Sequence, residues 1–199
     1  MIEPSLQVIV IAGPNGAGKS TLVPLMLRDT YGLEDFVNAD TIAQGLSAFA
    51  PESVAFEAGR VMLKRLHGLA KQRVSFAFET TLSSRSYAPW IAGMRQQGYE
   101  SNLMFFWLRS SELAVQRVRG RVRMGGHNVP ESVIRRRYIK GVRNFFDLYQ
   151  ALADSWGVYD NSSPGEPKFV AKGSGSSVTE IFIEDTWQQL VRQVNESRT

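Results

Sequence analysis

The 199-residue sequence has no cysteine and only two histidines. Without cysteine the chain can form neither a disulfide framework nor a cysteine nucleophile, and two histidines argue against a histidine-based metal site. No apolar run approaches the roughly 20 residues that cross a bilayer, and no signal peptide begins the chain. These absences favour a cytoplasmic location and no membrane partner.

Acidic residues are scarce in one part of a mildly basic chain. The formal net charge is +4, and residues 117–143 hold eight arginines and Lys140 against the single acid Glu131. Such a patch can bind nucleic acid or the phosphates of a small ligand. The length predicts a single domain over 1–199 with a sizeable core.

One motif carries most of the chemical information. Residues 13–21 follow the apolar run 8–12, precede a helix-forming stretch and match G-x-x-x-x-G-K-[ST], the phosphate-binding loop. Backbone N–H groups of such a loop surround the β-phosphate of a nucleoside triphosphate, and glycines permit the close approach. We expect an exposed Lys19 to reach the β- and γ-phosphates and Ser20 to ligate Mg²⁺. The residues expected to bind ATP are Gly13, Pro14, Asn15, Gly16, Ala17, Gly18, Lys19, Ser20 and Thr21.

Strand and helix patterns alternate along the chain without a linker or repeat. Strands are predicted over 7–12, 36–40, 74–79, 101–108, 158–161 and 169–171. Helices are predicted over 19–28, 41–50, 52–72, 87–97, 111–124, 131–155 and 186–195. This order predicts an α/β fold of the P-loop NTPase type, with a mostly parallel central sheet flanked by helices. Ligands of such sheets bind beyond the carboxyl ends of the strands.

Two predicted strands end in an acid at this edge. Asp40 ends the second strand and Glu79 ends the third, where Thr80, Thr81 and further hydroxyl side chains follow. The hydroxyl run suits a polar, uncharged ligand. Asp40 also fits a simple N-cap of the helix that begins at Thr41, so both interpretations stay open.

The most apolar strand, 103–108, is followed by Arg109 rather than by an acid. Motor ATPases and switch GTPases place an Asp there. Its absence favours a small kinase that phosphorylates a bound metabolite.

The basic region forms two helices around residues 125–130, Gly-Gly-His-Asn-Val-Pro. Arg117 and Arg121 lie four residues apart on one helix face, and Arg137 flanks the apolar stripe of the next helix. A helix pair with a glycine joint and inward arginines predicts a nucleotide-kinase-like lid over about 110–150, which clamps the transferred phosphoryl group. A solvated basic face is the alternative, and His127 in the joint is expected to be a surface or capping group.

Over most of its length the chain resembles the zeta-toxin-like P-loop kinases. The resemblance rests on the motifs at 11–21, 36–40, 78–82, 125–138 and 159–162. The better-known toxins of that family phosphorylate a sugar hydroxyl of UDP-N-acetylglucosamine. This chain is shorter than the larger toxins, and its Gly-Gly-His-Asn-Val-Pro joint differs from their lid sequence.

The resemblance implies roles for individual residues. Asp40 matches the acid that takes the proton from the substrate hydroxyl, and Lys19 matches the loop lysine. Glu79, Thr80 and Thr81 match a substrate-contacting segment. Arg121 and Arg137 are the expected lid pair, with Arg117 and Arg123 as competitors.

The sequence thus predicts an ATP-dependent, Mg²⁺-requiring kinase of a metabolite hydroxyl, with a nucleotide sugar such as UDP-N-acetylglucosamine as acceptor. A hydroxyl of a nucleoside, an antibiotic or an RNA end is an alternative acceptor. A non-catalytic, NTP-binding partner protein is the alternative from another class. The resemblance also implies a small helical antitoxin as a partner, whereas nucleic acid is not an expected partner.

Overall fold

The computed structural model describes residues 5–21, 23, 27 and 31–198. In this part of the chain a seven-stranded sheet has the order β2-β3-β1-β4-β5-β6-β7. The strands are β1 (Leu6–Ala12), β2 (Phe36–Val37), β3 (Phe76–Thr80), β4 (Tyr99–Trp107), β5 (Ser155–Asp160), β6 (Lys168–Ser174) and β7 (Ser177–Ile181). Strands β1 to β5 pair in parallel, and β6 and β7 add to β5 in antiparallel fashion. The predicted α/β fold with a mostly parallel sheet is confirmed.

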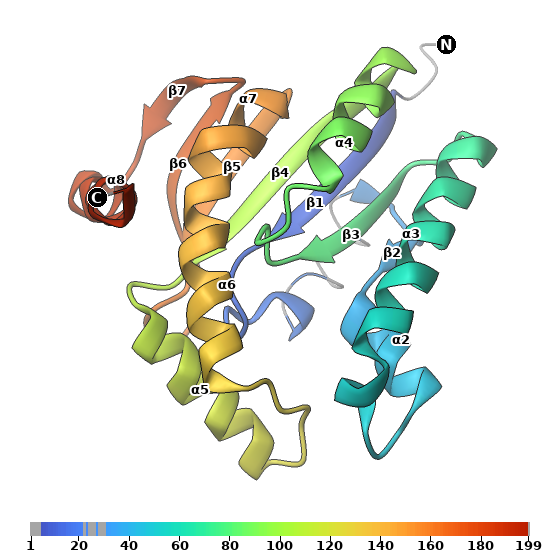
Figure 1. Cartoon of the computed structure of the whole chain (residues 1–199). Helices are drawn as coiled ribbons and strands as arrows, with labels where there is room; N and C mark the ends of the chain where they lie inside the picture. Colours follow the sequence, from blue (N-terminus) through green and yellow to red (C-terminus); the bar gives the residue numbers. More distant parts are fainter. Residues whose placement is uncertain (1–4, 22, 24–26, 28–30, 199) are drawn as a thin grey trace.

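Helices cover the sheet and surround one edge of it. The described helical segments are α2 (Ala39–Leu46), the 3₁₀ turn η1 (Pro51–Val54), α3 (Ala55–Gln72), α4 (Tyr87–Gln96), α5 (Ser111–Arg123), α6 (Glu131–Asn144), the π-helical turn η2 (Phe145–Tyr149), α7 (Gln150–Leu152) and α8 (Glu184–Arg198). Figure 1 shows α4, α6 and α7 crossing in front of the strands, with α5 beyond the strand ends. The helix predicted after the phosphate loop begins at Lys19, but its predicted end at Arg28 lies outside the described residues.

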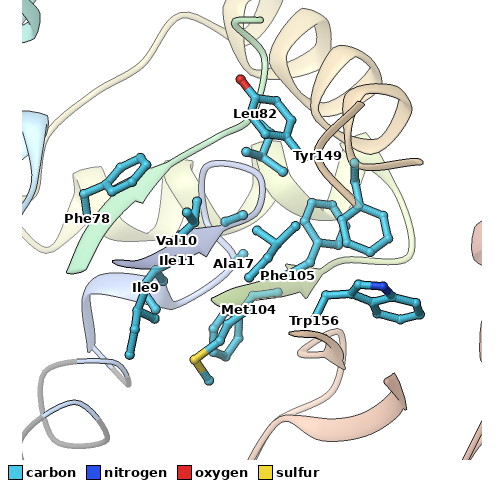
Figure 2. Close-up of a cluster of buried hydrophobic side chains, with 14 of the residues drawn as sticks. Ile9, Val10, Ile11, Ala17, Phe78, Leu82, Met104, Phe105, Tyr149 and Trp156 are labelled. Carbon is cyan, nitrogen blue, oxygen red and sulfur yellow. The ribbon is translucent and has the colours of Figure 1, made fainter. Parts of the chain in front are cut away.

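The core lies on both sides of the central strands. Residues 8–12 of β1 are at most 1% exposed because β3 and β4 flank this strand and helices cover the sheet. Figure 2 shows Val10 of β1 and Phe105 of the neighbouring β4 in the buried cluster, to which Tyr149 and Trp156 also belong. The buried strands therefore hold the phosphate loop on a rigid support. None of the described helices is long and apolar enough to span a bilayer.

Several predicted boundaries are wrong, each for a local reason. The helix expected over 41–50 is α2, which begins at Ala39 and ends at Leu46. The single helix expected over 131–155 contains a π-helical turn and ends at Leu152, before β5 begins. Strand β7 was not predicted because it is an edge strand whose residues are mostly exposed, so it lacks the apolar pattern of a buried strand.

Candidate active site

The phosphate loop joins the end of β1 to the helix that begins at Lys19. Gly13 has a φ of 140°, and a Cβ at this position would lie 2.1 Å from the carbonyl oxygen of Phe106 on β4. Gly16 has a φ of 80° and faces the Ala114 carbonyl of α5. Only glycine fits both positions, so the loop can lie closely against β4 and α5.

Lys19 is buried, contrary to the expectation that its side chain is exposed. Only 4% of it is accessible, and its Nζ donates to the carbonyl oxygens of Gly13 at 2.7 Å and Pro14 at 2.9 Å. A carboxylate oxygen of Glu79 lies 3.4 Å from the same nitrogen. The ammonium group is thus held within the loop, where phosphate oxygens can replace the carbonyl contacts.

Glu79 binds the phosphate loop. The Ser20 hydroxyl donates to its Oε2 at 2.8 Å, although the two residues are 59 positions apart. The pairing of β1 with β3 places Glu79 opposite Ile11, so the acid lies one residue before the end of its strand and beside the loop. Glu79 therefore supplies an acid beside the phosphate loop from β3, whereas Leu108 and Arg109 follow β4.

Asn38 connects this carboxylate to helix α2. Its Nδ2 donates to Oε2 of Glu79 at 2.8 Å, and its Oδ1 accepts from the backbone nitrogens of Asp40 at 2.7 Å and Thr41 at 3.3 Å. Asn38 is thus the N-cap of α2, and the N-cap interpretation of Asp40 is wrong. Asn38 was not among the predicted site residues, although asparagine is among the best N-cap residues and stands directly before the helix.

A pocket of about 230 Å³ brings the predicted substrate residues together; we call it the acceptor pocket. Asp40, Glu79, Thr80, Thr81 and Arg137 all line it, as does Asn15 from the phosphate loop. Residues of α2, β3 and α6 thus meet next to the loop. The pocket holds two carboxylates, one guanidinium group and several hydroxyls, which suits a hydroxyl-bearing ligand close to a phosphate.

The other candidate lid arginines lie in different surroundings. Arg117 donates to the Gly16 carbonyl oxygen at 3.5 Å, and burial lowers its pKa while the charge of Asp160 opposes that shift. Arg121 donates to the His127 carbonyl oxygen at 2.8 Å, and its Nε is buried with no hydrogen-bond partner in the described structure. Arg123 is exposed. Arg117 is therefore the arginine tied to the phosphate loop, and Arg137 is the one that lines the acceptor pocket.

Arg135, which flanks the same apolar stripe as Arg137, is tied to two acids. It pairs with Glu131 at 2.8 Å and with Glu112 of α5. The contact with Glu112 joins α6 to α5, and both contacts lower the pKa of the acid concerned, chiefly through the hydrogen bonds from Arg135. Arg135 therefore ties α6 to α5.

Asn161 supports the phosphate loop from the end of β5. Its buried Nδ2 donates to the Ala17 carbonyl oxygen at 2.8 Å. Asn161 belongs to the 159–162 motif, for which no role was predicted. The contact joins segments 144 positions apart, so the sequence alone carried no direct sign of it.

The fold and its loop define a P-loop protein, in which a mostly parallel sheet carries a phosphate loop after β1. A family model described as an AAA domain, AAA_33, matches residues 8–138, and because this is more than half of the chain, the chain belongs to that family. An uncharacterized protein of Haemophilus influenzae is 28% identical over 132 residues, which cover 66% of this chain and 92% of that protein.

Two solved structures share the fold. The AvrRxo1-ORF1:AvrRxo1-ORF2 complex with sulphate ions matches with a TM-score of 0.73 at 16% identity, covering 94% of this chain; this chain spans 64% of that one. A structure of the PezAT chromosomal toxin-antitoxin system of Streptococcus pneumoniae matches with a TM-score of 0.65 at 16% identity, covering 98% of this chain and 88% of that one. At these identities the likeness establishes the fold, as the zeta-toxin resemblance predicted.

Proposed function

We propose that this protein is an ATP-dependent kinase that transfers the γ-phosphate to a hydroxyl group of a small molecule. The observation that carries this proposal is the acceptor pocket, in which Asp40 and Arg137 lie beside Asn15 of the phosphate loop. A carboxylate that can accept a proton and a guanidinium that can stabilise phosphoryl charge are the groups that the reaction needs. ATP is the proposed donor, and the AvrRxo1 complex of the same fold was also solved with ATP.

Asp40 is proposed to accept the proton of the attacking hydroxyl. The N-terminal turn of α2 holds its backbone through Asn38, which leaves the carboxylate free of the capping role. Lys19 and Arg137 neutralise charge as the phosphoryl group moves, with Arg121 completing the lid pair. Positioning and charge stabilisation supply most of the acceleration in this class of reaction.

The Ser20 hydroxyl and the Glu79 carboxylate fit Mg²⁺. Both are hard oxygen donors, and they already lie 2.8 Å apart. Mg²⁺ bound there with the ATP phosphates would neutralise charge on the β- and γ-oxygens. Glu79 keeps the Ser20 hydroxyl oriented, and Asn38 keeps Glu79 oriented.

The acceptor is proposed to be a polar metabolite, with UDP-N-acetylglucosamine and nucleosides as the first compounds to compare. Thr80 and Thr81 supply hydroxyl groups at the acceptor pocket, which supports a ligand with several hydroxyls of its own. A small helical antitoxin is a further proposed partner, supported by the fold shared with a toxin-antitoxin structure.

Asp40→Asn tests the proposal. Asparagine cannot accept the proton, so phosphoryl transfer should fall by roughly 10²–10⁴-fold. The melting temperature should barely change, because Asp40 does not cap α2. The measurement is ATP-dependent mass gain in a metabolite mixture, alongside a thermal melt.

Transfer by Asp40→Asn at the wild-type rate would remove Asp40 from the mechanism and make Glu79 the next candidate base. If the wild-type protein binds ATP but transfers phosphate to no compound, the non-catalytic partner protein becomes the better description. Lys19→Ala is the matched control for background turnover.

A further inference from the structure

A second cavity, of about 490 Å³, lies between the loop after α2 and the joint of the lid. We call it the distal hollow. Gln44, Phe49 and Glu52 line it from one side, and His127 and Asn128 line it from the lid joint. The proposed transfer chemistry uses none of these residues. The distal hollow is large enough for a ring-bearing part of a ligand.

The distal hollow lies further along α2 than the acceptor pocket. Asp40 lines the acceptor pocket and Gln44 lines the distal hollow, and residues four apart lie on one helix face about 5–6 Å from each other. The neighbouring chain segment runs the same way, since Glu52 lines the distal hollow while Ala55 lines the acceptor pocket. The distal hollow is therefore within reach of a molecule that has its reactive hydroxyl at Asp40 and extends along α2.

Two side chains of the distal hollow are in energetically unfavourable surroundings when no ligand is bound. Phe49 is fully exposed, at 102% of its reference area, so its ring gains nothing from burial. The Nδ1 atom of His127 is buried without a hydrogen-bond partner in the described structure, and the nearest carboxylate oxygen, of Glu52, lies 3.8 Å away. A planar group that stacks on Phe49 would bury this ring, and its polar edges would face Gln44, Glu52 and Asn128.

The charge of the distal hollow decides which kind of ring fits. None of the described residues that line it is a lysine or arginine, while Glu52 contributes a carboxylate. This composition disfavours a phosphate and favours a hydrogen-bond donor on the ligand. Carboxylates accept from the amino group of cytosine, and glutamine or asparagine pairs with adenine through one donor and one acceptor. Uracil has no amino group.

We propose that the distal hollow binds an amino-bearing nucleobase, so that the acceptor is a nucleoside-type molecule with cytosine or adenine. Phe49 stacks on the base, and Gln44, Glu52 and Asn128 contact its edge. This assignment rests on the proposed function, because it takes Asp40 as the site of the reacting hydroxyl. It names the class of acceptor and makes Phe49 and Glu52 residues that determine specificity.

The test is saturation-transfer NMR on the full chain with cytidine, adenosine and uridine, followed by titration of the bound nucleosides. Cytidine or adenosine should receive saturation at its base protons, and uridine should bind at least fivefold more weakly. Phe49→Ala should weaken that binding by about tenfold or more, as expected for loss of one base–aromatic stack. Glu52→Gln should reduce the preference over uridine. Phe56→Ala is the matched control, since Phe56 is 83% exposed and lines neither cavity.

The proposal is overturned if no nucleoside receives saturation at its base, if uridine binds as well as the others, or if Phe49→Ala binds within twofold of the wild type. Asp40→Asn separates this proposal from the proposed function. It should keep base binding while losing phosphoryl transfer. Transfer to a compound that carries no base would leave the kinase assignment intact and remove the nucleobase assignment.

Discussion

Replacing Asn38 by serine separates the two roles of this buried side chain. Serine caps a helix about as well as asparagine, so the backbone nitrogens of Asp40 and Thr41 keep an acceptor. Its short side chain cannot reach Glu79, so the 2.8 Å hydrogen bond from Asn38 Nδ2 is lost. Asn38→Ala removes both the cap and this bond.

The structure sets the size of each effect. A hydrogen bond to a charged group contributes roughly 1.5–3 kcal/mol, and both variants lose the one to Glu79. The missing N-cap costs Asn38→Ala about 1 kcal/mol more, which lowers its melting temperature by about 2–4 °C relative to Asn38→Ser in a domain of this size. Loss of a group that orients a metal ligand typically reduces metal affinity or activity by about 10–100-fold.

The assay is ATP turnover over a range of Mg²⁺ concentrations, measured for both variants together with their thermal melts. Both should need about 10–100-fold more Mg²⁺ for half-maximal activity, or lose activity to that extent at saturating Mg²⁺. The two variants should be alike in this respect and differ only in stability. Ser155→Ala, on the far end of β5, is a control for general surface effects, since Ser155 is exposed and contacts Asn102.

Wild-type Mg²⁺ dependence in Asn38→Ser would refute the argument that Asn38 positions Glu79. So would activity that returns fully when both variants are held well below their melting temperatures. In either case Asn38 would only cap α2.

Three further predictions concern the loop, the lid and the core. Lys19→Ala should abolish ATP turnover while unfolding stays cooperative, and comparable steady-state ATP consumption by this variant would contradict the kinase assignment. Arg121→Ala and Arg137→Ala should each lower kcat on the order of 10³-fold with little loss of ATP binding. An increase in KM for ATP at unchanged kcat would mean that the substituted arginine only anchors the bound phosphates. Burial raises the pKa of Tyr149 from its ordinary value of 10.0 to about 12, so the unfolded chain releases this proton at a lower pH than the folded chain. The free energy of unfolding should therefore keep its full value below about pH 10 and decline toward about pH 12, and the decline should be shallower in Tyr149→Phe. Denaturant titrations at about pH 9 and 11 measure this decline. An equal decrease of the free energy of unfolding with pH in both proteins would contradict the prediction.

The sequence by itself determined the phosphate loop and the fold class, because both depend on short-range patterns. The loop is one contiguous motif, and its glycines are required by its own backbone angles. The alternation of apolar strands and amphipathic helices predicted the mostly parallel sheet. The acid at 79 was visible locally in the same way, because it follows an apolar run, whereas the strand predicted to end at Asp40 ends at Val37, and Asp40 lies in the first turn of α2.

Only the tertiary structure decided which groups Glu79, Asn38 and the arginines of α6 contact. The pairing of β1 with β3 brings Glu79 to Ser20, and the hydrogen bonds of Asn38 join Glu79 to α2. The packing of α6 decides that Arg137 lines the acceptor pocket while Arg135 binds acids within the lid. These contacts join segments distant in the chain, so they depend on strand order, register and helix rotation, which no local pattern of residues specifies.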